Sequence, residues 1–262
     1  MLKLMKYEFR KMRTVLLILL GGVALLQAAF MVGDKIEDYR VVGVSLTLLT
    51  LLAFVVYFYI MAAGFLSYSR ELSDKTGYMA FMTPVGPMKL IGSKLLFTAL
   101  TAIVVTALFA AAAVYDYRTI FSRLEIDPEL YEQANLAFRM FTTTAAGTPM
   151  SLTQVLLRLL FMLGSVMIGL MLFMCTAYLS ITLGSTLLQA KKGFLRGVVT
   201  IAMFLALNYV TNRVAGLVSG SGEFDDMAQV MRSLGAQAGI ELAIAVAFTG
   251  LTAWLLDRKV SL

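Results

Sequence analysis

The residues best suited to a specific interaction lie in one polar segment, residues 70–95, which reads RELSDKTGYMAFMTPVGPMKLIGSKL. Residues 70–76 can form a helix that Gly77 would end with a left-handed cap. Thr83 and Pro84 are typical of an N-cap followed by a first-turn proline, and they predict the start of the next helix. Between these two signals lies a short apolar patch made of Tyr78, Met79, Phe81 and Met82.

An exposed apolar patch beside charges usually marks a contact surface for another molecule. The same patch could instead lie among lipid headgroups as an interfacial anchor. The residue types and their spacing leave both interpretations open.

The sequence lacks the side chains on which much hydrolytic and metal chemistry depends. It has no histidine and one cysteine, Cys175, which excludes Ser-His and Cys-His nucleophile pairs, histidine-containing zinc sites and intrachain disulfides. A phosphate-binding loop needs the pattern G-x-x-x-x-G-K-[ST]. The nearest match, residues 86–94, has too many residues between its glycines and no hydroxyl residue after Lys94. We therefore expect that the chain is not an enzyme and binds no cofactor or metal itself.

Six apolar runs must position the polar segment. A helix needs about 20 apolar residues to cross a hydrocarbon core about 30 Å thick. Only 15% of the residues are charged, against about 25% in ordinary soluble domains. The sequence therefore predicts an all-α integral membrane protein organised as one transmembrane domain. The predicted spans are residues 14–32, 41–66, 95–115, 153–188, 197–212 and 239–256, with an extracellular loop over residues 116–150.

The distribution of basic residues predicts the orientation of these spans. Most of the 22 lysines and arginines lie before the first span, between spans two and three, between spans four and five, and after span six. Basic connections stay in the cytoplasm, so both termini and the polar segment are expected there. The net charge of +6 then reflects topology and contact with membrane lipid or a cytoplasmic partner, not with nucleic acid.

Residues 1–13 are predicted to form an amphipathic helix that lies at the membrane surface before the chain turns inward. Its apolar residues share one arc, and its basic residues point elsewhere. A cleaved signal peptide is the alternative, but the apolar core, residues 15–32, exceeds the usual length of about 7–15 residues. The interfacial residues that we single out are Lys3, Met5, Phe9 and Arg10.

The fourth span carries the main polar set within the membrane. Small and hydroxyl residues more often let helices pack than contact a substrate. The alternative is a candidate translocation path formed by Thr176, Ser180, Thr182, Ser185 and Gln189. Residues 159–190 carry no charge and would make about 48 Å of helix, so we predict one tilted span that could be broken near Gly184.

Two ionisable residues, Arg158 and Glu241, are expected near the outer ends of their spans, where long side chains reach water. A brief surface or re-entrant helix is expected at residues 225–234, before the sixth span. An ion-coupled secondary transporter should place acids near the middle of the membrane. We expect none there, which weakens that alternative.

The order of these parts resembles the permease subunits of type-2 ABC transporters: a surface helix, two spans, a charged loop followed by TPV, then four spans. The resemblance covers essentially the whole chain in architecture and is carried locally by a short motif. The matching residues are Glu71, Lys75, Gly77, Thr83, Pro84 and Val85, followed by Lys94.

The resemblance implies that residues 70–76 form a cytoplasmic coupling helix that docks on a separate ABC ATPase subunit, with the N-terminal helix as a second contact. It also implies two ATPase copies, which carry ATP and Mg, and a second permease copy, identical or related. The residues assigned to the ATPase contact are Arg70, Glu71, Asp74, Lys75, Gly77, Tyr78 and Phe81.

The expected function is an exporter in a bacterial plasma membrane. Its expected cargo is amphipathic or lipophilic: a peptide such as an antimicrobial or toxin peptide, a drug, or a lipid-like molecule. The competing hypotheses are an ion-coupled secondary transporter and a membrane scaffold or sensor that recruits a cytoplasmic protein without transport.

Overall fold

The computed structural model describes residues 2–73, 86–123, 151–187, 194–219 and 227–260, and these residues form helices without any strand. Each of the helices in these ranges is long and apolar enough to cross a membrane. The predicted all-helical fold with six candidate spans is therefore confirmed. The helices are α1 (Leu2–Ile36), α2 (Tyr39–Ser73), α4 (Pro87–Arg123), α6 (Leu152–Leu187), α7 (Phe194–Ser219) and α8 (Met227–Val260).

Most of the helices are longer than the spans predicted for them. A helix of 35 residues, such as α1 or α2, is about 52 Å long, whereas a hydrocarbon core is about 30 Å thick. The extra turns carry charged residues that the apolar runs did not include. These turns position the polar groups described below.

Helix α8 shows the largest difference from the predicted boundaries, because it begins at Met227 and not near residue 239. The expected separate helix at residues 225–234 is wrong where the structure describes it, since α8 continues through Gly235 and Gly239. A helical glycine costs only about 1 kcal/mol relative to alanine. At Gly235 the missing side chain leaves room for Phe161 of α6, whose ring would lie 3.2 Å from an added Cβ.

Helix α4 also begins away from the predicted position. The Gly86 carbonyl accepts hydrogen bonds from the amides of Lys89 and Leu90, so Gly86 is the N-cap and Pro87 is the first helical residue. The predicted start at Thr83 and Pro84 is therefore wrong for the described helix, and those two residues lie outside the described ranges.

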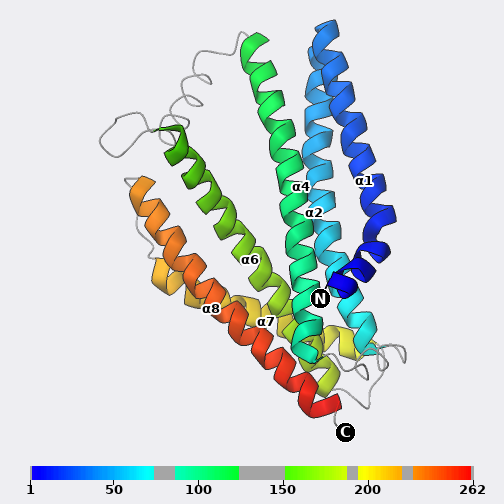
Figure 1. Ribbon diagram of the computed structural model, residues 1–262, viewed down its shortest axis with the longest axis vertical. Coiled ribbons are helices and arrows are strands. Elements are labelled where there is room, and N and C mark those ends of the chain that lie inside the picture. The colour runs from blue at the N-terminus through cyan, green and yellow to red at the C-terminus, as the bar shows by residue number, and fades with distance from the viewer. Residues whose placement is uncertain (1, 74–85, 124–150, 188–193, 220–226, 261–262) are drawn as a thin grey trace. The chain divides into compact units, whose positions relative to one another are not determined.

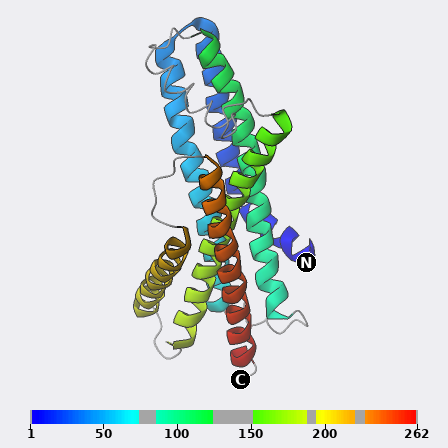
Figure 2. The same cartoon turned by 90° about the vertical axis from the view of Figure 1, so that its left-hand side faces the viewer.

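The chain divides into two compact units, Met1–Leu124 and Glu125–Leu262, and each is described separately. In the first unit α1, α2 and α4 lie side by side (Figures 1 and 2). The first turns of α1, in dark blue, bend away from the line of the rest of that helix in both views.

The turn between α1 and α2 shows why these helices form a tight hairpin. Glu37 adopts a positive φ of 60°, and the Asp38 amide donates to the Gly33 carbonyl at 3.0 Å. This is a Schellman ending for α1. Asp38 then caps α2, because its carboxylate accepts a hydrogen bond from the Arg40 amide.

The core of the first unit combines apolar contacts with one polar pair. Val56 and Ile60 of α2 and Val105 of α4 are fully buried, and side chains of α1, among them Leu16, Leu19 and Val23, pack against them. Beside this core Tyr57 of α2 shares a hydrogen bond of 2.6 Å with Thr106 of α4.

In the second unit α6 packs against both α7 and α8. Helix α6 is continuous from Leu152 to Leu187, so the break considered near Gly184 is wrong. Gly184 has a different role, since a side chain there would collide with Thr200 of α7 and would lie 3.5 Å from the Thr200 Cα. The glycine allows the backbones of α6 and α7 to approach closely, as small residues do in membrane helix pairs.

Replacing Gly184 with alanine should therefore destabilise the second unit by about 1–3 kcal/mol, the usual cost of an overpacked contact. The matched control is Gly164→Ala in the same helix, where an added Cβ meets nothing within 4 Å. Thermal unfolding of the purified chain in detergent would measure both variants. Equal stability of the two variants would contradict a close approach at Gly184.

Candidate functional site: a buried ion-pair cluster

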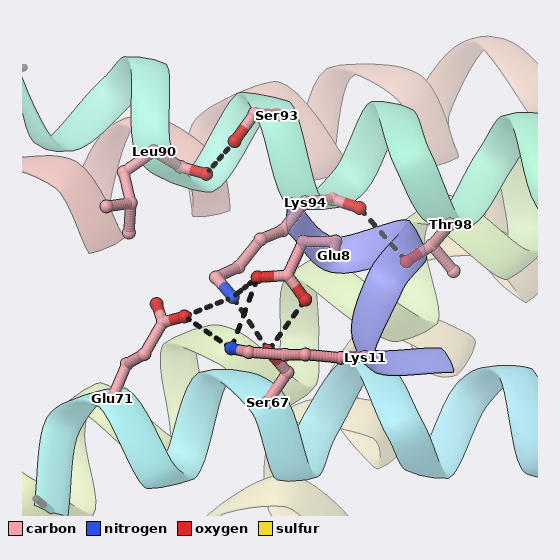
Figure 3. A network of polar contacts seen from close by, with 8 residues as sticks. All are labelled: Glu8, Lys11, Ser67, Glu71, Leu90, Ser93, Lys94 and Thr98. Carbon is pink, nitrogen blue, oxygen red and sulfur yellow. Dashed lines mark hydrogen bonds and ion pairs between the residues drawn. The ribbon is translucent and has the colours of Figure 1, made fainter. Parts of the chain in front are cut away.

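Three helix ends of the first unit bring four charged side chains together. Helix α1 contributes Glu8 and Lys11, α2 contributes Ser67 and Glu71, and α4 contributes Lys94 (Figure 3). We call these five residues the Lys94 cluster. It joins the beginning of α1, the end of α2 and the beginning of α4, which lie at the same end of the unit (Figure 1).

The Lys94 ammonium lies at the centre of this cluster. Its nitrogen is 2.7 Å from Glu8 Oε1, 2.9 Å from Ser67 Oγ and 2.9 Å from Glu71 Oε1. An ammonium group has three hydrogens to donate, so these contacts use all of them. Each acceptor comes from α1 or α2, so one side chain of α4 connects the other two helices.

The remaining contacts complete the network around Lys94. Ser67 donates its hydroxyl hydrogen to Glu8 Oε2 at 2.9 Å. The Lys11 ammonium lies 3.4 Å from Glu71 Oε1 and 3.7 Å from Glu8 Oε1. The cluster therefore contains two positive and two negative groups, and its formal charges balance.

Burial makes the pairing of these charges energetically important. Lys94 is 4% exposed and Glu8 is 6% exposed, whereas the side chain of Lys11 is 37% exposed. Removing an ion from water costs several kcal/mol unless opposite charges and hydrogen bonds compensate. The loss of either Lys94 or Glu8 would leave its partners buried without that compensation.

The geometry is suited to holding helices together and not to catalysis. An ammonium whose three hydrogens are all donated has no lone pair, so it cannot act as a base or a nucleophile. Each carboxylate is held by a lysine. What the cluster can do is transmit a displacement of one helix end to the other two, because separating them would break buried ion pairs.

Two of the residues predicted to contact an ATPase lie in the last turn of α2. Glu71 belongs to the Lys94 cluster, and the Arg70 side chain is exposed. The others lie outside the described residues: Asp74, Lys75, Gly77, Tyr78 and Phe81.

The predicted interfacial residues lie in the first turns of α1. Met5 is half-buried, Phe9 is 51% exposed and Arg10 is exposed. Lys3 belongs to the same helix, but its side chain lies outside the described part. The inward positions are those of Glu8 and Met12, which are both buried. An interfacial role for this helix stays a prediction.

Sequence reasoning did not find the partnership of Lys94 with Glu8. Lys94 served only as a marker of the start of a span, and Glu8 only as an acid in a basic region. One signal was available: Lys94 lies among apolar residues, so a long charged side chain there needs a partner. The sequence does not say which of several nearby acids that partner is.

The polar residues predicted for a translocation path lie on α6, except Gln189, which is outside the described residues. Thr176, Ser180 and Thr182 are each 1% exposed or less. Their hydroxyls donate to carbonyls one turn earlier in the same helix, and that of Ser185 donates to the Thr182 carbonyl. Such internally bonded hydroxyls are expected where helices pack, and the translocation path stays a prediction.

The whole chain was compared with protein-family models, with curated proteins and with solved structures. None of the three comparisons finds a match to it.

Proposed function

We propose that this chain is the membrane-spanning subunit of an ATP-driven exporter of the type-2 ABC kind. In this proposal it lies in a bacterial plasma membrane with both termini in the cytoplasm, as its basic connections favour. Six helices of sufficient length and apolarity are consistent with such a permease. The similarity of residues 71–85 to the charged loop and TPV motif of these subunits supports the assignment.

One observation carries the proposal: Lys94 bonds both Glu8 and Glu71 in a buried cluster. Glu8 lies in the helix, and Glu71 in the segment, that the resemblance assigns to the two ATPase contacts. A subunit that receives force from outside the membrane needs such contacts to be connected to its spans. Lys94, at the beginning of α4, provides that connection.

The mechanism follows from this connection. Closure of two ATPase subunits on ATP and Mg pushes on residues 70–76, of which residues 70–73 form the last turn of α2. Because Glu71 and Glu8 share Lys94, the ends of α1, α2 and α4 move together, and the spans change between inward and outward states. The assembly contains two ATPase copies and a second permease, and its cargo is an amphipathic or lipophilic peptide, drug or lipid-like molecule.

Reconstitution tests this function. The chain would be co-expressed with each candidate ABC ATPase subunit of its organism, purified and placed in proteoliposomes containing a fluorescent amphipathic peptide. We expect a stable complex and peptide movement that requires ATP and Mg. Stable association without any transport would favour a recruiting scaffold instead.

A second candidate, an ion-coupled secondary transporter, is favoured by one observation. Glu241 lies close to the middle of α8, whereas an outer position was expected from the sequence. An acid near the middle of a span is typical of ion-coupled carriers. Transport by the chain alone, driven by an imposed ion gradient, would select this alternative.

A further inference from the structure

Glu241 occupies an unusual place for an ionisable side chain. Arg232 and Arg258 flank the apolar part of α8, and the Arg258 guanidinium lies 4.5 Å from the centre of the Trp254 ring, a pair typical of a membrane interface. Glu241 lies between them, nine residues after Arg232 and seventeen residues before Arg258. Glu241 therefore lies within the apolar helix itself, inside the candidate span Ala228–Arg258, and its expected position near the outer end of the span stays a prediction.

The neighbouring helix α6 packs against this position. The Glu241 carboxylate faces Gly169 of α6, where an added Cβ would lie 3.3 Å from Glu241 Oε2. Gly169 is near the midpoint of α6, which runs from Leu152 to Leu187. The carboxylate of α8 therefore contacts α6 near the centre of each helix. Gln237, one turn earlier in α8, donates a hydrogen bond of 2.8 Å to Glu241 Oε1.

The carboxylate has no basic partner within the described part of the chain. Its polar contact there is the hydrogen bond from Gln237. A charged group at the centre of a bilayer is costly and is usually paired with an opposite charge. One amide hydrogen bond from Gln237 does not supply that charge.

From this placement we propose that Glu241 binds the positive charge of a lipophilic organic cation, with Gln237 orienting the carboxylate. The inference rests on the proposed export function and names the class of cargo. A divalent metal ion would need several oxygen ligands, and one carboxylate does not provide them. A lipophilic cation needs only one countercharge, because the rest of its surface is apolar and is compatible with the apolar side chains of the surrounding helices.

The test uses two probes of similar size and opposite charge, tetraphenylphosphonium and tetraphenylborate. Binding of each to the purified full chain in lipid nanodiscs would be measured by equilibrium dialysis, with empty nanodiscs as background. The test variant is Glu241→Gln, which keeps the shape and removes the charge. Asp257→Asn is the matched control, because it removes an exposed acid from the same helix.

We expect the Kd for tetraphenylphosphonium to rise about tenfold or more in Glu241→Gln and to stay unchanged in Asp257→Asn. The Kd of the chain for tetraphenylborate should not rise in either variant. Equal cation binding by the wild type and Glu241→Gln, or wild-type binding no greater than that of empty nanodiscs, would overturn the proposal. No ATPase is present in this experiment, so its result is independent of whether ATP drives transport.

Discussion

Replacing Lys94 with methionine should destabilise the first unit by about 3–5 kcal/mol, the cost of breaking a buried ion pair by removing one partner. Methionine has a similar length but no charge, so the buried Glu8 and the half-buried Glu71 would remain beside each other without Lys94. Glu8 would lose the closest contact that it makes, the one of 2.7 Å to the lysine nitrogen. Equilibrium unfolding of the purified chain in mixed micelles would measure the loss.

Two further variants test whether the loss of stability comes from the ion pairs of Lys94. Lys89→Met changes an exposed lysine in the first turn of the same helix and should have an effect within about 0.5 kcal/mol. Combining Lys94→Met with Glu8→Gln and Glu71→Gln removes the uncompensated charges and should restore most of the lost stability. A triple variant no more stable than Lys94→Met would show that the ion pairs are not what makes Lys94 important.

Replacing Glu71 with glutamine should uncouple transport from ATP hydrolysis while leaving the chain folded. Lys94 keeps its ion pair with Glu8 in this variant, so the cluster loses only the ion pairs of Glu71 with Lys94 and Lys11. A hydrogen bond to a charged group contributes about 1.5–3 kcal/mol. Transport per ATP hydrolysed should therefore fall about tenfold to a hundredfold, measured in proteoliposomes with the ATPase partner bound.

The control for this variant is Asp257→Asn, which removes an exposed acid outside the cluster. This variant should transport as much cargo per ATP hydrolysed as the wild type does. Binding of the ATPase to Glu71→Gln should be measured by co-purification, because the prediction concerns transmission and not assembly. An unchanged transport ratio with normal binding would contradict a role for the cluster in transmitting force.

The sequence predicted the helical fold well because the signal for it is physical and local. A run of about 20 apolar residues has few stable alternatives to a spanning helix, and all six predicted spans fall on helices. Helix ends were predicted less well. A polar residue is compatible with a helix that continues beyond the hydrocarbon, so α8 could begin at Met227 without any change in its apolar run.

The cluster and the contact of Glu241 with Gly169 could not be predicted for related reasons. Lys94 bonds Glu8 across 86 residues of sequence, and no periodicity connects positions so far apart. Glu241 was placed from the start of an apolar run, whereas its contact with Gly169 of α6 depends on how the two helices pack. Both depend on the packing of helices, which composition and charge counts do not determine.

In the proposed function the end of α2 faces the cytoplasm and receives an ATPase. The most direct measurement places a single cysteine at Arg70, an exposed position, in a chain whose own Cys175 is replaced with alanine. A membrane-impermeant maleimide should label it in inverted membrane vesicles and not in intact cells, and the bound ATPase subunit should prevent labelling. Labelling from outside intact cells would contradict the orientation, and labelling unaffected by the ATPase would contradict the docking.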